Sequence, residues 1–236
     1  MNLKGIYAEK SISVKFALFC ILTFFSVFIF SLLSYALIPI FFKFNFSELN
    51  ILLSDYNNAT SVKALKFLQL FSSVGLFVIP PLLFAHLTTF SLRFKQSISR
   101  QRTLLTVAIM LLIHPFIAYL LQWNQNLVLP EFLEGLQIWI EASELKAKQI
   151  TEAFLEMSSM GDLLVNLILI ALIPAIGEEL LFRGVFQQLF AKWTGKVHLA
   201  IFISAFLFSA IHIQFFGFLP RFVLGIILGY MFYWSK

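Results

Sequence analysis

Long runs of apolar residues, separated by shorter polar stretches, form most of the chain. The runs cover roughly 16–42, 67–90, 103–123, 162–190, 198–217 and 219–235. A bilayer core about 30 Å thick is crossed by a helix of about 20 apolar residues, and several of these runs reach that length. The pattern therefore predicts an all-α fold, a polytopic transmembrane helical bundle with about six spans.

The first run, Phe16 to Phe42, is longer than the apolar region of a secretory signal, which has about 7–15 residues, and no small-residue cleavage site follows it. We expect it to be a retained first helix. Composition agrees with a membrane protein, because 60% of the residues are hydrophobic, 12% are charged and the mean hydropathy is +0.89. The single cysteine, Cys20, excludes a disulfide framework and a cysteine-based zinc cluster.

The net charge of +5 is distributed over the ends of the predicted helices and not gathered in one patch, so we expect no nucleic-acid partner. One side of the bundle carries basic residues with almost no acids among them. These residues are Lys4, Lys10, Lys15, Arg93, Lys95, Arg100, Arg102, Lys192 and Lys196. The positive-inside rule makes this side cytoplasmic, so both termini of a multi-pass cell-membrane protein are expected in the cytoplasm.

The other side carries the mixed-charge loop 43–66 and the long acidic loop 124–161. Apolar residues in the long loop, such as Phe132, Leu136 and Ile140, recur with a roughly helical period. Two interpretations stay open here. The loop is either an amphipathic helix near the outer interface or a solvated connector.

Glycine and proline add two local expectations. Gly225 and Gly229 form a GxxxG pattern in the last run, which is typical of a close helix-packing face. Pro174 lies one turn before Glu178, so we expect a local kink of the helix beside that acid.

Three ionisable residues, Glu178, Glu179 and Arg183, interrupt the fourth run within IGEELLFRGVF. One charge at bilayer depth costs at least ~2.5–3.5 kcal/mol on insertion scales, so the group needs partners or water. Glu179 and Arg183 are four residues apart with the acid first, the arrangement that favours an intrahelical ion pair. Glu178 is rotated by about 100° from Glu179. We predict that Glu179 and Arg183 form a structural ion pair, and that Glu178 is available for a chemical role.

A second polar group, His212, follows one turn after Phe208 in FSAIHIQ. A short turn around Gly195 joins the two runs, so we predict an antiparallel hairpin. Glu178 and His212 are equally distant from Gly195 in sequence, which puts both about 25 Å from the turn. The same count places Arg183 beside Phe208 and Ser209. A carboxylate and an imidazole at one depth are suited to hold and deprotonate a water as a general base.

Each of these residues also has a structural interpretation. Intramembrane acids serve proton relays or packing, and a lone histidine is often a satisfied polar group between helices. Arg221, at the outer start of the last run, either snorkels to the interface or binds a carboxylate of a peptide substrate.

Glu178-Glu179-Leu-Leu-Phe-Arg183 fits an EExxxR pattern, and Phe208-Ser-Ala-Ile-His212 fits FxxxH. In this order, each on its own run, they resemble the first two motifs of the CPBP family. This family comprises the type II CAAX prenyl endopeptidases and their bacterial relatives, including bacteriocin-immunity-type proteins. The resemblance covers about residues 160–236. It implies an α-helical intramembrane endopeptidase, a hydrolase in which Glu178 and His212 activate a water, supported by Glu179, Arg183 and Phe208.

On this basis we expect an N-terminal transmembrane region, residues 1–160, with three spans and the outer acidic loop, and a CPBP-like core, residues 161–236. The family's third motif, a histidine followed four residues later by an asparagine or a similar residue, has no counterpart in this sequence. The chain ends at Lys236, where the helix with that motif would begin. We therefore expect either a truncated form or a member that has lost part of its site, which leaves the activity of these residues open.

We expect no cofactor, because a metal-free water is the simpler account. Glu178 and His212 as two zinc ligands remain the alternative, although catalytic zinc normally takes three protein ligands. The expected partners are membrane lipid and a hydrophobic peptide or membrane protein, and the resemblance implies a prenylated CAAX-type substrate. Two other functions stay open: a non-enzymatic membrane immunity or scaffolding protein that binds a peptide, and a proton-coupled transporter.

Overall fold

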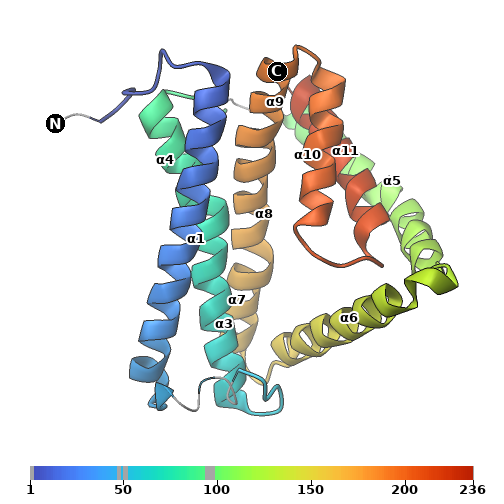
Figure 1. Cartoon of the computed structure of the whole chain (residues 1–236). Helices are drawn as coiled ribbons and strands as arrows, with labels where there is room; N and C mark the ends of the chain where they lie inside the picture. Colours follow the sequence, from blue (N-terminus) through green and yellow to red (C-terminus); the bar gives the residue numbers. More distant parts are fainter. Residues whose placement is uncertain (1–2, 47–48, 50–52, 94–98, 236) are drawn as a thin grey trace. The chain divides into compact units, whose positions relative to one another are not determined.

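The computed structural model describes residues 3–46, 49, 53–93 and 99–235. The basic residue Lys95 and the terminal Lys236 lie outside this part. The regular elements within it are all helical, as predicted (Figure 1). The chain forms two compact units, Met1–Leu92 with Ala147–Leu181 and Arg93–Lys146 with Phe182–Lys236, and each is described by itself. The predicted border between residues 160 and 161 stays a prediction.

The first unit contains three long helical segments. Its elements are α1 (Ile12–Phe42), α3 (Ala59–Ser73), η2 (Val74–Val78), α4 (Ile79–Thr88), α7 (Met160–Asn166), η4 (Leu167–Leu172) and α8 (Ile173–Glu178), where η2 and η4 are π-helical. α1 packs against α3, η2 and α4, and α8 packs against η2. Gly177 permits the second contact, because a Cβ there would lie 2.5 Å from the Cβ of Phe77.

Two prolines of this unit, Pro80 and Pro174, follow π-helical segments, whereas Pro39 lies inside α1. The N–H of Ile79, just before Pro80, bonds to the carbonyl of Val74, and that of Ile173, just before Pro174, bonds to the carbonyl of Ile168. Proline clashes with the carbonyl four residues earlier in an α-helix, and a wider turn beside it accommodates the ring. The helix near Pro174 thus contains a π turn, and the kink expected there stays a prediction.

The second unit contains α5 (Arg100–Gln125), η3 (Glu131–Leu133), α9 (Gln187–Thr194), α10 (Val197–Ala210) and α11 (Phe218–Trp234). The chain passes between the units three times: between Leu92 and Arg93, within α6 (Glu134–Leu155) and within the π-helical η5 (Glu179–Phe186). Gly195, with φ of +68°, ends α9 in the left-handed conformation that glycine adopts without strain. α10 packs back on α9, so the predicted hairpin is confirmed.

α11 lies close to α10 through its two glycines. A Cβ on Gly225 would lie 3.0 Å from the Cβ and 3.1 Å from the Cα of Ala205, and a Cβ on Gly229 would lie 2.8 Å from Cγ2 of Ile201. The GxxxG packing face predicted from the sequence is confirmed.

Four helices in the described part are long and apolar enough to cross a membrane. They are Ile12–Phe42, Ala59–Thr88, Arg100–Gln125 and Met160–Thr194, and they agree with the first four predicted runs. The last two runs differ from the prediction, because α10 has 14 residues and α11 has 17, fewer than the about 20 that span a bilayer. The predicted six spans are therefore not confirmed.

The acidic loop 124–161 contains the 22-residue helix α6. Of the two interpretations left open by the sequence, a helix is therefore confirmed and a connector without regular structure is not. Most side chains of α6 are exposed, and its few buried residues include Ile140, one of the apolar positions that set the predicted period. Its expected place near the outer interface stays a prediction.

The contact between α10 and α11 predicts opposite effects for two glycine substitutions. Gly225→Ala puts a methyl group against the backbone of Ala205, so we expect the free energy of unfolding to fall by about 1–3 kcal/mol. Gly135→Ala, on exposed α6 with nothing within 4 Å, should raise it by about 0.4–1 kcal/mol. Denaturant unfolding in detergent, followed by tryptophan fluorescence, measures both. Equal effects of the two substitutions would contradict the close contact.

Candidate active site

The two acids of the EExxxR motif lie where the helix changes its winding. Glu178 is the last residue of α8 and is half-buried, and Glu179 is the first residue of η5 and is exposed. Both belong to the first unit. π-helical turns inside α-helices are frequent at functional sites, because they change which residues face a neighbour.

The arginine of the motif lies in the second unit, where its side chain is 2% exposed. Its Nη2 donates to the carbonyl of Gly225 at 3.3 Å, and its guanidinium carbon lies 4.9 Å from the ring centroid of Phe208. The neighbour predicted for Arg183, Phe208, is therefore confirmed, and a cation over an aromatic face is favourable away from water. The predicted ion pair with Glu179 stays a prediction.

Phe208 forms an aromatic platform for the polar groups of this unit. Its ring packs edge-to-face against Phe182, with centroids 5.2 Å apart, and against the His212 imidazole, with centroids 5.4 Å apart. The ring is nearly fully buried. The structure thus brings Arg183, Phe208 and His212 together around one aromatic ring.

His212 is not on a helix, contrary to the sequence-based expectation of a run through residue 217. α10 ends at Ala210, and His212 lies in the turn that follows. The predicted distance of about 25 Å from the turn at Gly195 assumed a helix as far as His212, and that assumption holds only as far as Ala210. The physical reason is that a run of apolar residues predicts burial and does not report where the chain leaves the helix.

The imidazole of His212 has a defined orientation. Its Nδ1 lies 2.8 Å from the carbonyl oxygen of Phe208. A carbonyl oxygen only accepts hydrogen bonds, so Nδ1 carries the proton and donates. In the neutral ring Nε2 is then the nitrogen with the lone pair, which is the nitrogen able to accept a proton.

Side chains from two other elements hold the loop that carries His212. Nδ2 of Asn124, at the end of α5, donates to the carbonyl of Phe215 at 2.6 Å, and the N–H of Phe216 donates to Oε1 of Glu144, on α6, at 3.0 Å. Asn124 is 4% exposed, so its hydrogen bond is shielded from water. Sequence reasoning missed both residues, because nothing in their local pattern links them to a loop so distant in sequence.

Arg221 lies in the first turn of α11 and closes the same loop from its far end. Its Nη2 donates to Oε1 of Gln214, and its guanidinium covers Gly217, where a Cβ would lie 2.5 Å from Nη1. Arg221 therefore contacts the loop, and its predicted role toward a substrate carboxylate stays a prediction.

Among the described residues, no group of three or more His, Cys, Asp or Glu side chains could hold a metal ion.

The hydrogen bond from the Phe216 N–H to Glu144 leads to a prediction about amide hydrogen exchange in the loop that carries His212. Glu144→Ala removes the acceptor of the Phe216 N–H, and the loss of about 1 kcal/mol should raise amide exchange over residues 211–217 about five-fold. Glu144→Gln keeps an acceptor oxygen and should change exchange little. Hydrogen–deuterium exchange with mass spectrometry measures the effect.

Glu141→Ala is the matched control, because Glu141 lies on the same helix and accepts a hydrogen bond from Gln137 on that helix. We expect it to leave exchange over residues 211–217 unchanged. Unaltered exchange in Glu144→Ala would contradict the positioning of the loop by α6.

Residues 160–236 match the family model of the type II CAAX prenyl endopeptidase Rce1-like proteins. The matched stretch contains both EExxxR and FxxxH. Searches of curated proteins and of solved structures returned no match. Together with the four long apolar helices, the match indicates a membrane protein with a region from a protease family. The match agrees with the family predicted from the two motifs: residues 160–236 are similar to Rce1-like proteins, which is consistent with the CPBP family.

Proposed function

We propose that this protein is an intramembrane endopeptidase that hydrolyses a peptide bond of a membrane-associated substrate with a water activated by Glu178 and His212. The observation that carries the proposal is the match of residues 160–236 to a family of prenyl endopeptidases, because both motifs lie inside it. A prenylated CAAX-type protein is the substrate class that this family suggests.

The chemical step follows from the two residue types. The carboxylate of Glu178 and Nε2 of His212 each accept one hydrogen of a single water, which leaves an oxygen lone pair for the substrate carbonyl carbon. As the C–O bond forms, the water proton passes to Glu178. Glu178 then protonates the amine as the C–N bond breaks, so the acid is regenerated as a carboxylate. The Nδ1–H bond of His212 to Phe208 supports this role, because it leaves Nε2 as the acceptor.

The remaining motif residues position the catalytic ones. In this proposal Glu179 pairs with Arg183, and Arg183 rests on Phe208, next to the imidazole. Glu144 and Asn124 hold the loop of His212. No metal takes part in the proposed step, and a zinc ion held by Glu178 and His212 is the alternative that a chelator would reveal.

We also propose that the protein lies in the cell membrane with both termini in the cytoplasm. Basic residues near the N-terminus, before α5 and at the end of α9 support this orientation through the positive-inside rule. α10 and α11 then enter the bilayer as a hairpin and do not each need to span it alone.

Substitution of the catalytic pair tests the proposal. We expect Glu178→Gln and His212→Ala each to lower cleavage of a prenylated CAAX peptide by about 10²–10⁴-fold, because each removes a general-base or water-holding group. The measurement is product release by the purified chain in proteoliposomes, with and without a metal chelator. Glu131→Gln, on exposed η3, is the control and should cleave normally.

The same assay separates the other two functions. A peptide that binds wild type and Glu178→Gln equally and is cleaved by neither would favour an immunity or scaffolding protein. A pH-dependent flux across the vesicle that Glu178→Gln uncouples would favour a transporter. Full cleavage by Glu178→Gln would overturn the proposed mechanism.

A further inference from the structure

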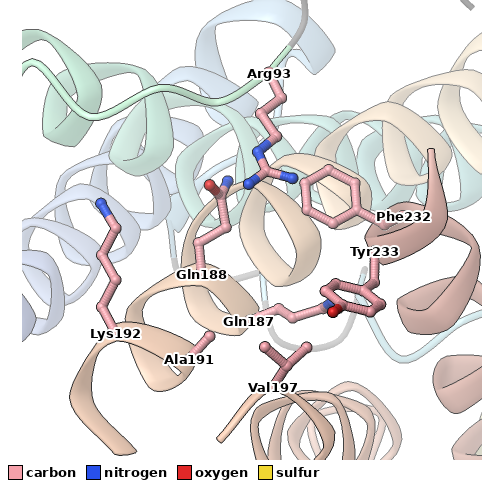
Figure 2. Close-up of a pocket in the computed structure, with 8 residues that line it drawn as sticks. All are labelled: Arg93, Gln187, Gln188, Ala191, Lys192, Val197, Phe232 and Tyr233. Carbon is pink, nitrogen blue, oxygen red and sulfur yellow. The ribbon is translucent and has the colours of Figure 1, made fainter. Parts of the chain in front are cut away.

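A pocket of about 210 Å³ lies in the second unit, lined by residues of α9, α10 and α11 and by Arg93 (Figure 2). None of its lining residues belongs to EExxxR or FxxxH, and the proposed proteolysis does not use it. Its polar lining includes Arg93, Lys192 and Gln187, and its apolar wall includes Phe232 and Val197.

The charge of this pocket is positive. Arg93 and Lys192 both line it, and no acidic residue is among its lining residues. The sequence from Phe182 to Lys236, which supplies most of the lining, contains no aspartate or glutamate. The guanidinium carbon of Arg93 lies 5.2 Å from the ring centroid of Phe232, and Figure 2 shows this side chain reaching between Gln188 and Phe232. The pocket therefore favours an anion.

The pocket lies at the level where apolar segments end. The candidate span Met160–Thr194 ends two residues after Lys192, and the candidate span Arg100–Gln125 begins shortly after Arg93. Trp193 and Trp234, at the same ends of α9 and α11, are 52% and 68% exposed. Tryptophan with lysine and arginine is typical of the membrane–water interface, where phospholipid phosphates lie.

We propose that this pocket binds the phosphate of an anionic phospholipid such as phosphatidylglycerol. The planar fork of Arg93 and the point charge of Lys192 bind the phosphate oxygens. The volume is below the ~300–1,000 Å³ of sites for drug-sized ligands, so it suits a headgroup and excludes a folded peptide. Basic pockets between membrane helices are known to hold lipid headgroups.

Lipid binding to the full chain tests the proposal. The purified chain in neutral detergent is titrated with short-chain phosphatidylglycerol, short-chain phosphatidylcholine or inorganic phosphate, and bound ligand is counted by native mass spectrometry. We expect phosphatidylglycerol to bind at least tenfold more tightly than phosphatidylcholine, because phosphatidylcholine is zwitterionic and has no net negative charge. The double substitution Arg93→Gln with Lys192→Gln should weaken phosphatidylglycerol at least tenfold.

Arg100→Gln is the matched control, because Arg100 is an exposed basic residue at the start of α5 and does not line the pocket. It should change the affinity by less than about twofold. Equal binding of the two lipids, or an equal loss in Arg100→Gln and the double variant, would overturn the proposal. Binding of inorganic phosphate as tight as that of phosphatidylglycerol would overturn the lipid as the source of the phosphate.

Discussion

The close approach of α11 to its neighbours at Gly225 and Gly229 is the constraint on which the rest of the second unit depends. A side chain at either position would collide with α10. The missing Cβ atoms also expose the carbonyls of these glycines, and two donors four residues apart use them. Arg183 donates to Gly225 and Gln187 donates to Gly229. One small-residue face thus fixes both the motif arginine and the buried amide of the basic pocket.

Phe208, on α10, links this helix contact to His212. Because α10 is held by α11, the Phe208 ring stays against Phe182 and offers one face to Arg183. Its carbonyl then fixes the imidazole of His212 through Nδ1. The phenylalanine of FxxxH is therefore best understood as a positioning residue that acts with both its ring and its backbone.

The sequence predicted the features that depend on local pattern. Glycine at 195 predicted the hairpin, residue spacing placed Arg183 beside Phe208, and GxxxG predicted the packing face. It did not predict that α10 ends at Ala210, because the bonds that favour the following loop come from Asn124 and Glu144, far away in sequence. Periodicity also does not distinguish α from π winding, so η5 was not foreseen.

The short α10 has a further physical consequence for His212. In the proposed membrane orientation Lys196 lies at the interface, and the 14 helical residues of α10 would reach about 21 Å into a hydrocarbon core about 30 Å thick. Irregular backbone at such a depth is tolerated only where protein or water satisfies its polar groups. Asn124 and Glu144 do so for Phe215 and Phe216. In the proposed orientation, His212 therefore lies on backbone of the kind that lines water-filled cavities, and the proposed hydrolysis would need such a cavity for its water.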